Sequence, residues 1–207
     1  MTKRDISLKK RGTKAKKERV TYLVVAEGRN KTETLYLSHF QEQGKDYYLR
    51  FVKAGNKTDA ESLYKTLIAK WKELGLSYAS GDRGFVVLDI DNDLQKVEKV
   101  LSLIQANRNE AISFVISNPV FEVWFLLHFK YTTKFFADGN AVIKDLKKFI
   151  PNYEKNLDCF DLCNERLPIA LKNAERLGEV FKDTDWPSVE CNPMTDMAEL
   201  VKILKVK

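Results

Sequence analysis

Several acidic side chains directly follow short apolar stretches of this chain. Glu27 closes one such stretch, and Asp89, Asp91 and Asp93 close another. If the apolar stretch before Asp89 is a strand that continues through residue 90, strand alternation puts the side chains of Asp89 and Asp91 on the same side of the sheet. Unpaired carboxylates so close together repel one another and raise each other's pKa, and a divalent cation removes that conflict. Because carboxylate oxygens suit Mg²⁺ or Mn²⁺, the spacing favours a metal site on Asp89 and Asp91, with Glu27 as a third candidate.

Three further acids have a structural explanation beside a metal-binding one. Asp93 precedes a helical pattern, and we favour a helix cap for it when it is taken alone. Glu33 fits a capping box with Asn30. Glu122 lies on an almost wholly apolar helix, where it needs either strong hydrogen-bond donors or a cation. His128 shares a face of that helix with aromatic residues, and we expect it to be a core histidine.

The elements that must position these acids alternate between strand and helix. Four βα units within residues 20–130 predict an α/β fold with a mostly parallel sheet and helices on both faces. In such sheets the working surface lies beyond the carboxyl ends of the strands, where these acids occur. The expected strands are 22–26, 47–52, 85–88 and 112–116; the expected helices are 32–40, 58–74 (with a Thr58–Glu61 capping box), 94–104 and 120–129 (capped by Ser117-Asn118-Pro119).

Charge and periodicity divide the chain into three expected regions. Residues 1–19 carry nine basic and two acidic side chains, whereas the rest of the chain has a net charge of −1. We expect 1–19 to be a disordered basic arm that attracts a polyanion. Residues 20–130 form the α/β core, and 131–207 form a mainly helical extension packed on it, with helices near 140–150, 164–182 and 195–205. Lys31, Lys53 and Lys57 lie near strand ends and are either phosphate contacts or solvated lysines.

Other classes of protein are excluded by simple absences in the sequence. No apolar run is long enough to span a membrane, and the N-terminus has no secretory pattern, so we expect a cytoplasmic protein without a membrane partner. The three cysteines lack paired CxxC spacing, which disfavours a zinc site. The chain also has no GxxxxGK[ST] segment, so it has no ATP-binding loop of that kind.

Four motifs resemble a known family, the RloB-like proteins, which include a component of the abortive-infection AbiL systems. The most specific motif is SNPxFExWxLLHF at residues 117–129. The resemblance covers roughly residues 20–202. Its other motifs are Glu27-Gly28 followed by Lys31-Thr32-Glu33, the DxDxD of residues 89–93, and NPxTD at residues 192–196.

The resemblance implies a Toprim-like fold, which is the catalytic domain of topoisomerases, bacterial primases and OLD-family nucleases. It implies that Glu27 is an acid/base or metal ligand, and that Asp89 and Asp91 hold Mg²⁺. Glu33 is the nearest match to a further acidic residue of OLD-like members. The resemblance also implies phage defence together with a separate ATPase subunit.

We therefore expect a Mg²⁺- or Mn²⁺-dependent nuclease, with Glu27, Asp89 and Asp91 as catalytic metal ligands. A second ion would be held by Glu33, Asp93 or Glu122. The substrate class is DNA or RNA, tRNA included. The chain is too short for the further domains of a topoisomerase or primase. The alternative is a non-catalytic Toprim-like module that binds nucleic acid or the ATPase.

Overall fold

The computed structural model describes residues 19–27, 32–41, 46–55 and 59–205, and its centre is a five-stranded sheet. The strand order is β2-β1-β3-β4-β5, in which neighbouring strands are parallel except for the antiparallel pair β4 and β5. This arrangement confirms the predicted mostly parallel α/β fold. The strands are β1 (Val20–Ala26), β2 (Tyr47–Val52), β3 (Arg83–Asp89), β4 (Ile112–Asn118) and β5 (Met194–Thr195).

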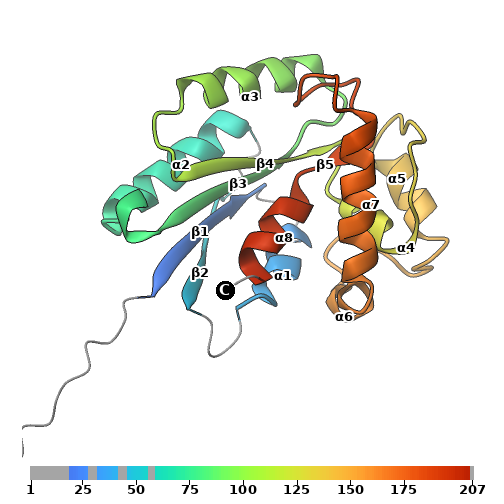
Figure 1. Ribbon diagram of the computed structural model, residues 1–207, viewed down its shortest axis with the longest axis horizontal. Helices are drawn as coiled ribbons and strands as arrows, with labels where there is room; N and C mark the ends of the chain where they lie inside the picture. Colours follow the sequence, from blue (N-terminus) through green and yellow to red (C-terminus); the bar gives the residue numbers. More distant parts are fainter. Residues whose placement is uncertain (1–18, 28–31, 42–45, 56–58, 206–207) are drawn as a thin grey trace, which may run out of the picture.

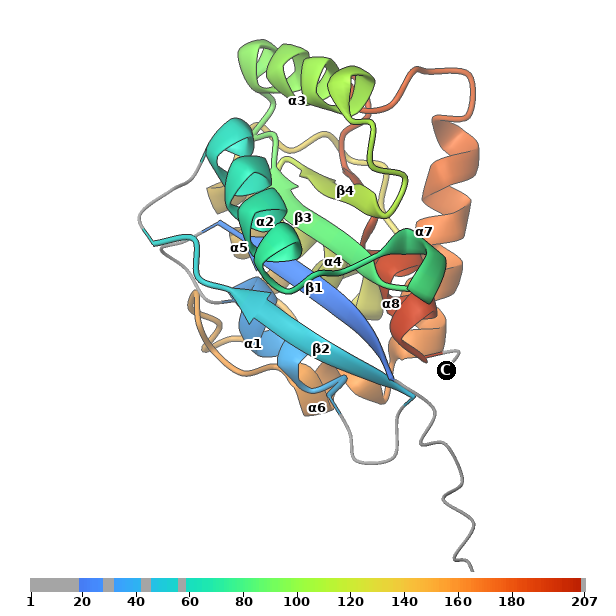
Figure 2. The same cartoon turned by 90° about the vertical axis from the view of Figure 1, so that its left-hand side faces the viewer.

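Helices cover both faces of the sheet (Figures 1 and 2). One face packs against α2 (Ala60–Glu73) and α3 (Leu94–Ala106), and the other packs against α1 (Thr32–Ser38), α4 (Glu122–Phe129) and α8 (Met197–Lys205). None of the helices in the described part of the chain is long and apolar enough to cross a membrane. The remaining helices are η1 (Tyr78–Ser80), α5 (Gly139–Leu146), α6 (Phe160–Asn164) and α7 (Leu167–Val180).

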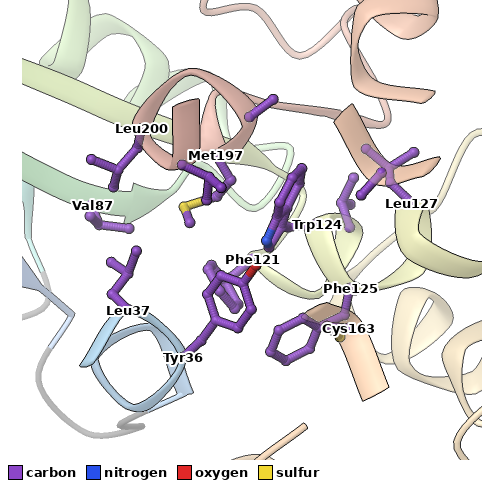
Figure 3. Packing of buried hydrophobic residues seen from close by; sticks show 14 of the residues in the cluster. Tyr36, Leu37, Val87, Phe121, Trp124, Phe125, Leu127, Cys163, Met197 and Leu200 are labelled. Carbon is purple, nitrogen blue, oxygen red and sulfur yellow. The ribbon is translucent and has the colours of Figure 1, made fainter. Parts of the chain in front are cut away.

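Strand alternation separates two hydrophobic clusters. In β1, Tyr22 and Val24 face the cluster around α1, α4 and α8, whereas Leu23 and Val25 face the cluster around α2 and α3. Figure 3 shows the first cluster, where Trp124 of α4 lies between α1 and α8. A fully buried side chain of this size stabilises the fold by about 2–3 kcal/mol. This cluster takes residues from Tyr22 to Leu204, so the C-terminal helices share one core with the sheet.

Helix α2 lies unusually close to strand β3 at one glycine. A Cβ atom at Gly84 would stand 2.4 Å from Ile112 Cδ1 and 2.9 Å from Leu67 Cδ2. Real Cβ atoms do not approach other heavy atoms so closely, so a larger residue here would displace the ends of these two side chains. The missing side chain at Gly84 therefore lets Leu67 of α2 pack directly against the strand.

One local prediction is wrong, and one lies outside the described residues. Ser117-Asn118-Pro119 does not cap α4, because the Asn118 side chain bonds to Cys191 O in a distant loop, and the helix begins at Glu122 without a side-chain cap. The expected helix 164–182 corresponds to α7, and the short helix α6 precedes it. Thr58 is not described, and Asp59 caps α2 by accepting from Ser62 N at 2.9 Å.

Candidate functional site

The acids predicted to act together lie at the point where the sheet reverses its strand order. Strand β1 stands between β2 and β3, so the chain leaves β1 towards one side and reaches β3 on the other. Ligands of open α/β sheets bind at such a point, beyond the carboxyl ends of the strands. Glu27 follows β1 and Asp89 ends β3, and both line a cavity of roughly 220 Å³ between the N-termini of α2 and α3.

The condition for alternation to align Asp89 with Asp91, a strand that continues through residue 90, is not met. The strand ends at Asp89, and Asp91 and Asn92 have φ angles of 50° and 58° in the left-handed region. Asp and Asn tolerate this region better than other non-glycine residues. The turn, and not the strand, therefore directs the Asp91 carboxylate.

Three asparagines from separate segments hold this turn. The Asn118 side-chain oxygen accepts from Asn92 N at 3.1 Å, and its amide nitrogen donates to Cys191 O at 3.0 Å. Asn192 donates to the Asn92 side-chain oxygen and accepts from Phe136 N at 3.0 Å. Asn118 and Asn192 are 0% and 4% exposed, so these bonds are shielded from water. The network explains in physical terms why the SNP and NPxTD motifs accompany the DxDxD motif.

Asp93 has the structural role favoured for it. Its side chain accepts from Gln95 N at 2.8 Å and from Lys96 N at 3.4 Å, which caps helix α3. Its carboxylate still lines the cavity, so the cap does not remove it from the site. Its predicted role as a metal ligand stays a prediction.

Glu33 and Glu122 approach the same edge of the sheet from the opposite face. Glu122 is 2% exposed, and its Oε1 accepts from the buried Tyr153 hydroxyl at 3.0 Å. Glu33, in the first turn of α1, is 8% exposed, and its Oε2 has no hydrogen-bond partner within the described ranges. By strand alternation Asp89 shares its side with Phe85 and Val87, which face these helices. Asp89 therefore stands between the cavity and the two buried glutamates.

The carboxylates interact strongly with one another. Burial raises the pKa of Asp89 well above its usual range, and the charges of Glu33, Glu27, Glu122 and Asp91 raise it further. Burial also raises the pKa of Glu33 to about 8, with Glu122 and Glu27 adding to the shift. The pKa of Glu27 is raised chiefly by burial, and Lys96 partly opposes that effect. All three shifts arise because negative charges lie close together where the protein partly removes them from water.

Two lysines supply positive charge to this cluster. Lys96 of α3 pairs with Asp91, lies 4.0 Å from Glu27 Oε1 and donates to the Asp89 carbonyl at 3.3 Å. Burial lowers its pKa, but these acidic neighbours outweigh burial and leave the pKa raised. Lys155 lowers the pKa of both Glu27 and Glu33. Its loop is fixed to α1, because Asn156 N donates to Thr32 Oγ1 at 3.1 Å.

The donor set fits a hard divalent cation better than any other common cofactor. Four carboxylates act electrostatically on that of Asp89, and a buried oxygen of Glu33 lacks a hydrogen-bond donor among the residues described. However, no group of three His, Cys, Asp or Glu side chains in residues 19–27, 32–41, 46–55 and 59–205 is already arranged to hold a metal ion. Binding would therefore require the side chains of Glu27, Asp89 and Asp91 to turn towards one centre and away from Lys96.

The remaining sequence candidates fall outside this cluster. Lys31 and Lys57 lie outside the described residues, and Lys53 is exposed and does not line the cavity. His128 is fully buried and its Nδ1 bonds to Trp124 O at 2.8 Å; burial lowers its pKa to about 4, so it is a neutral core histidine. Its position is the one that the apolar helix pattern predicted.

Sequence reasoning missed three residues that complete the site. Lys96 carries a weak signal, because it follows the aspartate cap by three residues and so faces back towards the strand end. Asn92 carries a signal only as part of the DxDxD motif. Lys155 carries none, because its loop reaches the cluster only through the tertiary fold. All three lie within the region covered by the family resemblance.

Comparison with known proteins gives one match, to a protein family. The family described as RloB-like protein matches residues 22–204, which cover every described residue of the acidic cluster. No curated protein and no solved structure matches the chain. The match confirms the resemblance inferred from the four sequence motifs.

Proposed function

This chain belongs to the RloB-like protein family, and we propose that it is a metal-dependent phosphodiesterase that acts on nucleic acid. The observation that carries the proposal is the coupling of Glu27, Glu33, Glu122 and Asp91 around Asp89 at the switch point of the sheet. A cluster of like charges that is partly removed from water is costly unless a cation is bound there. Mg²⁺ or Mn²⁺ is the cation that such a set of oxygens prefers.

The residues divide the work of phosphodiester hydrolysis. Glu27, Asp89 and Asp91 would hold the ion, which when bound polarises the phosphate and lowers the pKa of a coordinated water. Glu33, whose pKa burial raises to about 8, would keep its proton at neutral pH, and we propose it as the group that exchanges a proton with a reacting oxygen. Lys96 would neutralise a phosphate oxygen once the carboxylates turn towards the ion. Glu122 is held by a hydrogen bond from Tyr153, and its charge raises the pKa of Asp89 from the face of the sheet opposite the cavity.

The biological part of the proposal is a cytoplasmic effector of anti-phage abortive infection that works with a separate ATPase. Family membership and the motifs that resemble Toprim-like and AbiL proteins support it. The sequence itself has no GxxxxGK[ST] segment, so an ATP-driven step would need another subunit.

A cleavage assay tests the chemistry. Purified protein is incubated with labelled tRNA, single-stranded DNA and duplex DNA in Mg²⁺, Mn²⁺ or EDTA. We expect products only with metal, and none from the double variant Asp89→Ala/Asp91→Ala. Asp161→Ala/Asp183→Ala is the matched control, because it removes two exposed acids away from the cluster. Undiminished cleavage by the Asp89→Ala/Asp91→Ala protein would overturn the assignment.

The second candidate is a non-catalytic module that binds nucleic acid or the ATPase. The ion pair between Lys96 and Asp91 favours it, because an internal cation satisfies part of the acidic cluster without a metal. Titration of Mn²⁺ by calorimetry separates the two candidates. Metal binding that requires Asp89, together with cleavage in the presence of the ATPase partner, supports the enzyme. Binding of nucleic acid without metal binding and without cleavage supports the non-catalytic module.

A further inference from the structure

The amino ends of the strands carry a group of arginines and tyrosines at the edge of the sheet opposite the acidic cluster. A hollow of roughly 820 Å³ opens there between the beginnings of β1 and β2 and the end of α2. Arg19, Tyr48 and Arg50 line it. Tyr48 and Arg50 share one side of β2 by strand alternation, and Arg19 immediately precedes β1.

Both arginines lie against one exposed ring. The guanidinium carbons of Arg19 and Arg50 are 5.4 and 5.9 Å from the centre of the Tyr48 ring, and Tyr48 is 40% exposed. Within the described part of the chain, no carboxylate forms an ion pair with either guanidinium. Contact with a ring orients a guanidinium without using its hydrogen-bond donors. The hollow therefore presents two oriented cations without an acidic partner among the described residues.

Asp82, the acid among the described residues that line the hollow, is already bonded to the protein backbone. Asp82 is 8% exposed, and its carboxylate accepts from Thr21 N at 2.7 Å and from Ser77 N at 2.9 Å. Beside it, Arg83 donates to the Asp82 carbonyl at 2.7 Å and lies 4.3 Å from the ring of Tyr78, which is 49% exposed. A second pair of arginine and exposed tyrosine thus borders the first.

The sequence adds further positive charge at the same place. Residues 1–18 contain eight basic and two acidic side chains, and they are joined directly to Arg19. Any polyanion that enters the hollow is therefore bound next to the attachment point of a strongly basic segment. This charge pattern fits a chain of phosphates far better than a neutral or cationic partner.

We propose that this hollow binds single-stranded nucleic acid, with Arg19 and Arg50 on phosphates and Tyr48 against an unpaired base. Exposed tyrosines beside arginines provide both the stacking surface and the charge that single strands need. The proposal deepens the proposed function, on which it rests for the substrate class, by adding an anchoring surface. Seven residues of β1 separate the hollow from Glu27, which is about 20 Å along the strand. A strand held here would reach the acidic cavity several nucleotides further on.

Fluorescence anisotropy of the full chain in EDTA tests the proposal with dye-labelled single-stranded RNA and DNA over a KCl series. We expect the variant Arg19→Ala/Arg50→Ala to bind about tenfold more weakly, and the slope of log Kd against log [KCl] to fall by about 1.4 for two lost phosphate contacts. Tyr48→Ala should weaken binding of the single strand more than binding of a duplex of the same sequence. All three residues are exposed, and circular dichroism verifies that the variants fold.

The matched control is Arg166→Ala/Arg176→Ala. These arginines also lie over aromatic rings, 5.3 Å from Phe129 and 3.8 Å from Tyr131, but on the far side of the molecule at α7 (Figure 1). Equal losses from both double variants, unchanged binding by Arg19→Ala/Arg50→Ala, or an equal loss of affinity for polyglutamate would overturn the proposal. Binding in EDTA needs no catalysis, so failure of the nuclease assignment would appear separately, as intact binding without metal-dependent cleavage.

Discussion

Strand β3 has an aspartate at each end, and the two have opposite surroundings. Asp82 precedes the strand, and its carboxylate accepts from two backbone amides at 2.7 and 2.9 Å. Asp89 ends the strand, is partly exposed, and faces the charges of Glu33, Glu27, Glu122 and Asp91. A low exposure, such as that of Asp82, therefore does not mark a functional acid. The neighbours decide: donors make an aspartate structural, whereas other carboxylates leave it in need of a cation.

The largest expected difference between these two ends concerns metal-dependent stability. With Mn²⁺ at about a thousand times its Kd, a bound ion should stabilise the wild-type protein by about 4 kcal/mol. Asp89→Asn should lose this stabilisation entirely, because it removes the central negative charge. Asp82→Asn should keep it, while losing about 1–2 kcal/mol of stability in any buffer through its weakened hydrogen bonds. Thermal denaturation with and without Mn²⁺ measures both effects.

A result in which both variants keep the full Mn²⁺ effect would contradict the comparison. It would place any metal site elsewhere in the chain. The variant Arg19→Ala/Arg50→Ala serves as a further control, because it changes charge at the amino end of the sheet only. Its metal-dependent stabilisation should equal that of the wild type.

The second prediction concerns pH. The Glu33 pKa rises from 4.5 in the unfolded chain to about 8 in the folded protein, mainly through burial. Between these values the folded protein keeps a proton that the unfolded chain releases. The stability of the metal-free protein should therefore fall as the pH rises from about 4.5 to about 8, by on the order of 4 kcal/mol. Urea denaturation in EDTA across this range measures the slope.

Glu33→Gln should flatten that slope, since glutamine does not titrate. Asp161→Ala, at an exposed position of α6, should leave the slope unchanged. Saturating Mn²⁺ should oppose the fall in the wild type, because a bound metal competes with protons for the same carboxylates. A wild-type stability that rises between pH 5 and about 8 without metal would show that the acidic cluster is not held in protonated form.

The third prediction concerns Lys96, the cation that occupies the acidic end in place of a metal. Lys96→Met removes a positive charge beside Glu27 and Asp91, so it should increase the affinity for Mn²⁺ about fivefold to tenfold. Lys99→Met is the matched control, because Lys99 lines the same cavity without an ion pair to these acids. Calorimetric titration gives both affinities. Weaker Mn²⁺ binding by Lys96→Met would mean instead that Lys96 positions the carboxylates.

The parts of the fold that depend on local patterns could be predicted from the sequence. Apolar runs gave the strands, and the place of Glu27 and Asp89 at strand ends followed from them. Long-range contacts could not be predicted in this way. Asn192 reaches Asn92 across 100 residues, and that contact, together with Asn118, sets the left-handed turn at Asp91. The alternation rule does not apply at Asp91 because tertiary hydrogen bonds, and not strand geometry, determine its backbone.

The arginines of the amino end show the same limit. Arg19 and Arg50 are separated by thirty residues of sequence and meet only because β1 and β2 are adjacent and in register. Arginine is common on protein surfaces, and neither of these two arginines belongs to a sequence motif. Composition did indicate a polyanion partner, but it placed the charge only in the N-terminal segment. The pairing of strands extends that charge onto the folded body.

The smallest expected effect separates a helix cap from a metal ligand. Asp93→Ala and Asp138→Ala each remove an N-cap, of α3 and α5 respectively, so each should cost about 1 kcal/mol of stability. If Asp93 is only a cap, both variants should keep wild-type affinity for Mn²⁺, because the Asp138 cap lies on another helix. A tenfold weaker affinity confined to Asp93→Ala would add Asp93 to the ligands. Chemical denaturation and Mn²⁺ titration of the two proteins therefore determine how far the functional charge of the acidic end extends beyond Asp91.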